Sequence, residues 1–305
     1  MRVFAILLVA CASACSAKLT ATVDGAMGLP DLATGGSGGN DDLAGGGASD
    51  LAGGGGTPDL GRTFPTDPGT FFGPSRCAQL GALLCEDFEA GNVGDKPNAQ
   101  LWASSGTVAI DSTHAARGQK ALHLQTSSNG WATISETKTF PVANNHFFGR
   151  MFFWASGIPT NPSGSHWTVV EGSGTGNGSL IREGGQFDKW GTGSDQGPTG
   201  DWTNIDKDPN NAPVPPTLNH WMCIEWEYDG AKNETRFWWD GVEHPSLHET
   251  ASMHGGNAVP YVMPQFTQLK LGWMLYQVPM APGPTTFDFW LDEIAIDTAR
   301  IGCAL

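Results

Sequence analysis

The chain has 305 residues and a formal net charge of −15, from 31 acidic residues against 16 Lys and Arg. This balance excludes nucleic acid as a partner, because no basic stripe is present to neutralise phosphates. It leaves an acidic polysaccharide open, since a local group of Arg and Lys can dominate one cleft. All 12 Trp lie at or after Trp102, and most of the low-complexity glycine lies before Thr57. The composition therefore predicts one globular domain of roughly 230 residues, enough for a single hydrophobic core.

The N-terminus has the features of a targeting segment. Arg2 precedes a short apolar stretch, Val3–Ala10, which cannot span a bilayer of about 20 helical residues and is typical of an export signal. Leu8–Cys11 resembles a bacterial lipobox, Ala12–Cys15 is a second candidate, and an ordinary cleaved signal is the alternative. We interpret residues 1–15 as a lipoprotein signal peptide. We expect an exported protein, either a bacterial outer-membrane or cell-surface lipoprotein that meets the membrane only through its lipid anchor, or a secreted one.

Residues 16–76 form a segment rich in Gly and Asp. The triplet Asp-Leu-Ala recurs at 31–33, 42–44 and 50–52 between glycine runs. A repeat so short and so rich in glycine cannot bury a core, so the composition predicts a disordered, flexible tether. The folded domain is expected at 77–305.

Four cysteines follow the signal segment, and four cysteines allow three disulfide connectivities. We favour Cys77–Cys85, which closes a short loop at the domain entrance, and Cys223–Cys303, which ties a central strand to the C-terminal end. Free buried thiols are the alternative, and they are less common in an oxidising compartment.

From Cys77 onward the pattern is that of β-strands, rich in Val, Ile, Phe, Trp and Thr, and no helical pattern exceeds two turns. Asp229-Gly230 and Asp240-Gly241 are turn signals, and 191–218 is predicted to be a long loop. This pattern predicts an all-β sandwich of two sheets, most simply a jelly roll. The expected strands are 84–89, 105–111, 119–125, 132–140, 146–155, 165–171, 179–190, 219–229, 234–240, 266–276 and 286–297.

The run 179–190 carries the clearest chemical signal. If it is a single strand, its alternation places four side chains on one face: Arg182, Gln186, Asp188 and Trp190. Such a face suits a sugar acid, because Arg grips a carboxylate through its planar fork and Trp offers a flat apolar surface. An exposed polar strand face with one packed Trp is the alternative interpretation.

Two further strands predict cleft residues. In 165–171, His166, Thr168 and Val170 share one face. In 266–276, Lys270 and Tyr276 lie opposite an apolar set that should face the core, so both are expected to face the cleft and Lys270 to contact substrate.

Arg150 lies in the apolar strand 147–153. A charge in such a strand needs a ligand or a partner. It therefore binds substrate or pairs with a buried carboxylate.

Eight stretches resemble, in order, the secreted cellulose-induced protein family of cellulolytic fungi, and together they cover about 84–303. They are Glu86–Glu89, Gly106–Thr113, Gly164–Thr168, Arg182–Gln186, Trp221–Glu225, Leu271–Trp273 with Tyr276, Trp290–Glu293 and Asp297–Cys303. The resemblance implies a β-jelly roll similar to concanavalin-like and alginate-lyase folds, related to glucuronan and alginate lyases. It implies a catalytic cleft of four residues, His166, Arg182, Gln186 and Tyr276. Met274 stands where it predicts an acidic residue.

The resemblance also implies a structural calcium site. The side chains of Glu89 and Asp292 and the backbone carbonyls near Arg117 and Lys120 would provide the ligands, which is the oxygen chemistry that Ca²⁺ prefers. Because Glu89 and Asp292 come from opposite ends of the domain, a shared ion would clamp the two ends together. The alternative is that both are surface acids.

The reaction implied is β-elimination on an acidic polysaccharide, glucuronan or a similar uronic-acid polymer. Arg182 and Gln186 would stabilise the enolate-like charge on the substrate carboxylate. His166 is assigned as base and Tyr276 as acid, or Tyr276 takes both roles. A non-catalytic carbohydrate-binding protein on the same scaffold, and a structural surface lipoprotein, are the alternatives. We expect a monomer.

Overall fold

The computed structural model describes residues 63–127, 129–159, 165–176, 180–186, 189–206, 214–276 and 286–305. The chain divides into two units, 1–58 and 59–305, and every described residue belongs to the second. The predicted signal peptide and most of the predicted tether therefore lie outside the described residues, as does Asp188.

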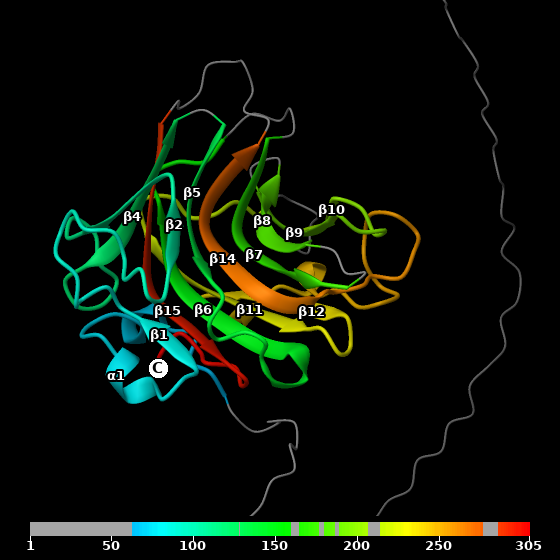
Figure 1. The fold of residues 1–305 in the computed structure, drawn as a ribbon, viewed down its shortest axis with the longest axis horizontal. Coiled ribbons are helices and arrows are strands. Elements are labelled where there is room, and N and C mark those ends of the chain that lie inside the picture. The colour runs from blue at the N-terminus through cyan, green and yellow to red at the C-terminus, as the bar shows by residue number, and fades with distance from the viewer. Residues whose placement is uncertain are drawn as a thin grey trace, which may run out of the picture. The chain divides into compact units, whose positions relative to one another are not determined.

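Two antiparallel sheets form the domain, and Figure 1 shows them packed against each other. The eight-stranded sheet has the order β13-β12-β11-β6-β15-β4-β3, with β1 added on β15. Its strands are β1 (Leu84–Glu86), β3 (Thr107–Asp111), β4 (Ala121–Ser127), β6 (His146–Ala155), β11 (Trp221–Asp229), β12 (Glu234–Trp239), β13 (Val242–Glu243) and β15 (Thr286–Asp297). The all-β two-sheet prediction is confirmed.

The seven-stranded sheet carries the features that matter for function. Its order is β10-β9-β8-β7-β14-β5-β2. The strands are β2 (Ala103–Ser105), β5 (Gly130–Glu136), β7 (His166–Thr175), β8 (Leu180–Gln186), β9 (Lys189–Asp195), β10 (Trp202–Ile205) and β14 (Gln265–Tyr276). The described helices are short, and comprise α1 (Cys77–Leu80) and the 3-10 turns η1 (Pro68–Thr70), η2 (Ala143–Asn145) and η3 (Pro245–Leu247).

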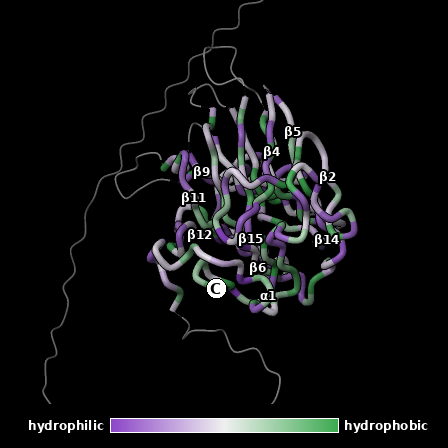
Figure 2. The backbone as a smooth tube through the Cα atoms, turned by 90° about the vertical axis from the view of Figure 1, so that its left-hand side faces the viewer, coloured by the Kyte–Doolittle hydropathy of each residue, from purple (hydrophilic) through white to green (hydrophobic). Residues whose placement is uncertain are grey.

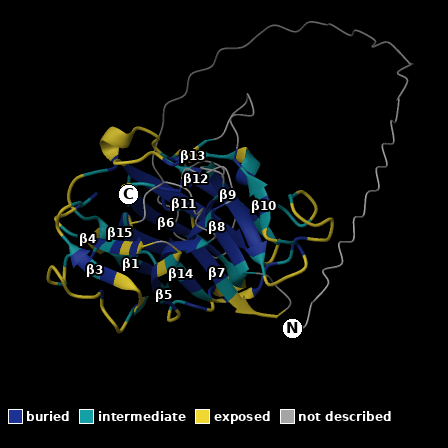
Figure 3. Ribbon diagram, turned by 90° about the horizontal axis from the view of Figure 1, so that it is seen from above, coloured by how far each residue is buried: buried dark blue, intermediate teal, exposed yellow. Residues whose placement is uncertain are grey.

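Aromatic side chains fill the space between the two sheets. Trp273 on β14 stacks on Phe289 of β15 with ring centroids 3.9 Å apart, and on Trp167 of β7 at 5.3 Å. Period-two alternation along each strand delivers these apolar residues to one face and polar residues to the other. Figure 2 shows apolar segments along the strands, and Figure 3 shows that the strands are mainly buried while the connecting loops are exposed.

The predicted strand 179–190 is two strands. β8 ends at Gln186 and β9 begins at Lys189, and the two pair as a hairpin. Trp190 therefore does not share a face with Arg182. It is fully buried in the core, where its ring lies 5.1 Å from that of Trp167, so its assignment as a substrate-binding residue is wrong. The physical reason is that the chain reversal breaks the alternation, and that burial of a whole indole stabilises the core.

The predicted loop 191–218 is also corrected, because it contains most of β9 and all of β10. The sequence of β9 is rich in Gly, Ser and Thr and lacks an apolar alternation, which hides the strand. Its partner strands on both sides determine its conformation.

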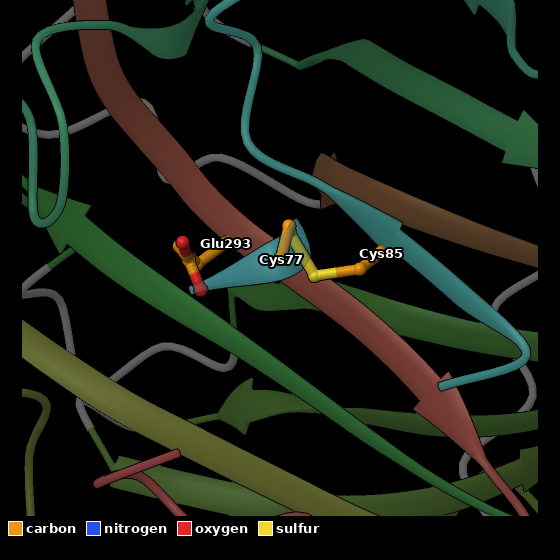
Figure 4. A group of neighbouring side chains, drawn as sticks. All are labelled: Cys77, Cys85 and Glu293. Atoms are coloured by element: carbon orange, nitrogen blue, oxygen red, sulfur yellow. A yellow bond between two sulfur atoms is a disulfide. The ribbon is translucent and has the colours of Figure 1, made fainter. Parts of the chain in front are cut away.

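Both predicted disulfides are present, Cys77–Cys85 and Cys223–Cys303. The first lies beside the carboxylate of Glu293, as Figure 4 shows. Sulfurs joined in a disulfide offer no thiolate, so this group is a structural contact and not a metal site.

Glu293 on β15 is the centre of a buried charge network. Its Oε2 accepts from Arg117 Nη1 at 2.9 Å and from Arg150 Nη2 at 3.1 Å, and all three side chains are fully buried. Arg117 Nη2 also donates to the carbonyl of Cys303, near the C-terminus that Figure 1 places beside α1 and β1. Arg150 thus pairs with a buried carboxylate, and its assignment as a substrate-binding residue is wrong. A cation this deep is tolerated only with such a partner.

Glu249, which follows η3 and pairs with β12, is a buried acid whose protonation can be tested. Its backbone pairs with Thr235, its side chain is fully buried, and this burial raises its pKa from 4.5 to about 8. The unfolded chain then binds fewer protons than the folded one between these two values, so Glu249 makes the stability fall as pH rises through this window.

We expect the substitution Glu249→Gln to leave the melting temperature nearly unchanged at pH 4.5 and to raise it relative to the parent protein at pH 8. The measurement is thermal unfolding of both proteins at the two pH values. A difference in melting temperature that does not change with pH would contradict the assignment.

Candidate functional site

Three residues form a row across the outer face of the seven-stranded sheet. Tyr276 on β14 is the register partner of His166 on β7, and His166 is the partner of Gln186 on β8. Directly opposed residues on adjacent strands point to the same face, with Cβ atoms about 4.5–5.5 Å apart. The predicted alternation of β14 is confirmed, because Leu271 and Trp273 are fully buried while Tyr276 is half-buried. The register therefore assembles the row.

His166 uses both of its ring nitrogens. Nε2 lies 2.5 Å from Nε2 of Gln186, and Nδ1 accepts a hydrogen bond from the indole N–H of Trp202. Because the indole can only donate, the lone pair of the neutral ring lies on Nδ1 and the proton on Nε2. The Gln186 amide then turns its oxygen toward that proton, an orientation that the hydrogen-bond network assigns. Trp202, on β10, thereby fixes the tautomer of His166.

Asp201 connects His166 to Arg182. Its Oδ2 lies 3.3 Å from His166 Nδ1, and its Oδ1 accepts from Arg182 Nη2. The adjacent His166 ring and the charge of Arg182 lower the pKa of Asp201, against the opposing effect of burial. Arg182 itself is buried and also lies 5.6 Å from the centre of the Trp202 ring. One carboxylate that is 53% exposed thus bridges the base candidate and the cation candidate.

A cavity of about 440 Å³ opens beside this row, and we call it the charged cavity. Its charged lining residues are Glu171, Arg182, Asp195 and Lys270, and Tyr276 lies at its wall. Lys270 Nζ donates to Glu171 Oε1 at 2.6 Å. Burial, and next the charge of Glu171, raise the pKa of Tyr276, so its phenol is held in the protonated form. The structure thus brings His166, Arg182, Gln186, Tyr276 and Lys270 to one site.

Three residues of this site are absent from the prediction. Glu171 joins the cavity because the register of β7 against β8 shifts between Thr168 and Val170, and a bulge changes which residues face outward. Val170 accordingly lies in the core rather than beside His166. Asp195 and Asp201 come from the segment interpreted as a loop, where no pattern in the sequence identified them.

The two predicted calcium-binding carboxylates, Asp292 on β15 and Glu89 after β1, both contact the loop before β4. Asp292 Oδ2 accepts from the backbone N–H groups of Ala116 and Arg117, and Glu89 Oε1 accepts from those of Gln119 and Lys120. Asp292 is fully buried, which rules out its interpretation as a surface acid. Among the described residues it forms no ion pair, so backbone dipoles alone compensate a buried carboxylate. Carboxylate oxygens are ligands that a hard cation prefers, so the side chains of Asp292 and Glu89 fit Ca²⁺ by their chemistry.

The site lies on the outer face of a two-sheet β-sandwich, and a family model assigns this chain to the polysaccharide-lyase-like group. The chain belongs to the Cip1-like family, because the family model described as "Cip1-like, core domain" of the polysaccharide-lyase-like group matches residues 89–299.

Solved structures are also similar to this chain. The chain is similar to "Cellulose induced protein, Cip1", with a TM-score of 0.56 and 21% identity over 72% of this chain and 99% of that one. It is also similar to the endo-β-1,4-glucuronan lyase of the fungus Trichoderma reesei, with a TM-score of 0.47 and 17% identity over 72% of this chain and 96% of that one. No curated protein matches the chain. At 21% identity the likeness to the first structure shows the fold alone.

The pair of Lys270 and Glu171 gives a test of the cavity's electrostatics. Because the Glu171 side chain is 7% exposed, Lys270→Met leaves a carboxylate without its partner, and we expect a loss of about 1–3 kcal/mol in the free energy of unfolding. The measurement is urea unfolding. Glu171→Gln serves as the matched variant, since the ammonium of Lys270 is 31% exposed and reaches water. The double variant should recover most of the loss. Additive effects of the two substitutions would show that the pair is not coupled.

Proposed function

We propose that this protein is a polysaccharide lyase that cleaves a uronic-acid-containing polymer by β-elimination. One observation carries the proposal: the register of β14, β7 and β8 places Tyr276, His166 and Gln186 in one row, with Arg182 at the cavity beside it. The reaction needs cations, a proton acceptor and a proton donor. Arg182, Lys270 and Tyr276 line the charged cavity, and His166 is the register partner of Tyr276.

The first requirement is to neutralise the carboxylate of the uronic acid. Removing the C5 proton develops an enolate-like charge on that group, and preorganised donors stabilise it. Arg182 and Lys270 are the cations of the charged cavity, and Gln186 offers an amide beside His166 in the row. Arg182 already binds the carboxylate of Asp201, so a substrate carboxylate must compete with Asp201 for this cation. Asp201 is half exposed and directly precedes the edge strand β10.

The second requirement is a proton acceptor and a proton donor. Nδ1 of His166 carries the lone pair, so it is the acceptor for the C5 proton once the sugar displaces Trp202 and Asp201 from this nitrogen. Tyr276 keeps its proton because its pKa is raised, so it is the donor to the departing O4. Of the two role assignments considered from the sequence, His166 as base and Tyr276 as acid is the one that this geometry supports.

A second candidate function is carbohydrate binding without catalysis. It is favoured by the engagement of both ring nitrogens of His166 and by Met274, which lines the charged cavity where the family resemblance predicts an acid. The two functions differ in whether an unsaturated product forms.

We expect the protein to release unsaturated oligosaccharides from uronate polymers, detected by the ultraviolet absorbance of the new C4–C5 double bond, with glucuronan as the first substrate. His166→Ala and Tyr276→Phe should each lower kcat by about 10²–10⁴-fold, the usual contribution of a proton-transfer group. His220→Ala, which removes an exposed histidine, is the matched control and should retain full activity. Binding without product in the parent protein would establish the second function instead.

We further propose that Glu89 and Asp292 hold a calcium ion together with the backbone carbonyls of Arg117 and Lys120. Such an ion would join β15 to the loop before β4 and would stabilise the folded domain by an amount that grows with the logarithm of its affinity. We expect calcium to raise the melting temperature and a chelator to lower it, with Glu89→Gln removing the response. Asp288→Asn is the control for a general effect of charge. An unchanged melting temperature on adding calcium to chelator-treated protein would refute the site.

The protein is proposed to be exported through residues 1–15 and held at a cell surface by a lipid on Cys11 or Cys15. Its two disulfides support export, because disulfides persist in oxidising compartments. Among the residues that the structure describes, no helix has the length and apolar character needed to cross a membrane.

A further inference from the structure

Trp131 is an exception among the tryptophans of this protein. All twelve are described, and Trp131, on β5, is the only exposed one, with 60% of its surface accessible. An indole gains about 1.5–3 kcal/mol or more from full burial, so a solvent-facing Trp on a well-ordered strand needs an explanation.

The ring lies beside the candidate catalytic row. Trp131 is the register partner of Met274 on β14, which is in turn the partner of Thr168 on β7. Its ring centroid is 6.3 Å from that of Tyr276, at an interplanar angle of 59°. Trp131 therefore stands on the outer face of the sheet, next to the proposed proton donor and toward the edge strand β2.

Trp131 and Tyr276 separate two cavities. Both residues, with Ser105, line the charged cavity and also a second cavity of about 700 Å³, which we call the neutral cavity. The remaining lining residues of the neutral cavity are Gly106, Asn129, Gly130 and Leu275, so among the described residues the Tyr276 phenol is its one ionisable group. A polymer that crosses Tyr276 therefore passes from charged surroundings to uncharged ones.

The backbone near Trp131 is shaped to leave this space. Gly106 has φ +77°, and a Cβ at this position would lie 2.0 Å from the carbonyl oxygen of Trp131. Glycine is therefore required where the chain turns from β2 into β3 against β5. The corner closes one side of the neutral cavity with backbone rather than with a side chain.

The chemistry of the neutral cavity suits an uncharged sugar. The C–H face of a pyranose packs flat on an indole, and hydroxyls at the ring edge meet hydroxyl and amide groups such as those of Ser105 and Asn129. A uronate in the same place would lose the water around its carboxylate without contacting a cation, and this desolvation costs binding free energy.

We propose that Trp131 forms a sugar-binding subsite for a neutral sugar unit, next to the uronate held in the charged cavity. This inference rests on the proposed function and narrows its substrate class: the preferred polymer links uronate to a neutral sugar rather than uronate to uronate along the whole chain. The Trp131 ring orients the neutral unit, and the uronate carboxylate lies at Arg182 and Lys270.

The test is binding of three probes to the whole protein by calorimetry: an oligoglucuronide, a neutral oligoxyloside, and an oligosaccharide that alternates glucuronate with a neutral sugar. We expect the alternating probe to bind most tightly. Trp131→Ala should weaken its binding by about tenfold, and Trp131→Phe by less, because the phenyl ring retains a smaller stacking face. The affinity for the oligoglucuronide should change by less than about twofold, since stacking on Trp131 contributes little to it.

Met253→Ala is the matched control, because Met253 is an equally exposed apolar side chain that lines neither cavity. Thermal unfolding should be unaffected in the Trp131 variants, since the ring is mostly in solvent. Equal affinity for the alternating probe and the oligoglucuronide, an unchanged affinity in Trp131→Ala, or no binding of any probe would overturn the subsite. Trp131-dependent binding of the alternating probe without any unsaturated product would instead overturn the lyase and leave the subsite standing.

Discussion

The antiparallel register of β14, β7 and β8 is the constraint on which the candidate site depends. A shift by one residue in either pairing would turn the partners of His166 toward the core and bring Leu275 or Gly185 into the row. The stacked rings of Trp167, Trp273 and Phe289 oppose such a shift, because the same register that buries them exposes Tyr276 and His166. Core packing and the site are thus two consequences of a single alignment.

A second constraint holds the ends of the domain to the opposite sheet. Glu293 accepts from Arg117 and Arg150 in the interior, and removing Glu293 would leave two buried cations without their shared carboxylate. This network, with the disulfide from Cys223 to Cys303, anchors the C-terminal residues to the eight-stranded sheet. The seven-stranded sheet remains free to present its outer face to a ligand.

The charge of the cleft connects the fold to the proposed chemistry. Two cations, Arg182 and Lys270, face three carboxylates, so the site does not attract an acidic polymer through net charge. Recognition of a uronate instead requires the exchange of Asp201 for the substrate carboxylate at Arg182, and the neutral cavity beside Trp131 supplies binding that does not depend on charge. Both features favour a substrate of moderate charge density.

The sequence by itself determined the all-β class, both disulfides, the outward face of β14 and the residues of the candidate row, because strand alternation and the family resemblance are local, collinear signals. Only the tertiary structure decided the rest. The hairpin after Gln186 places Trp190 in the core, and a bulge in β7 places Glu171 at the cleft. The segment of β9 and β10, which is rich in glycine, places Asp201 and Trp202 beside His166. Each of these positions depends on which strands become neighbours. Pairing between segments far apart in the chain determines the neighbours, and no local sequence pattern predicts it.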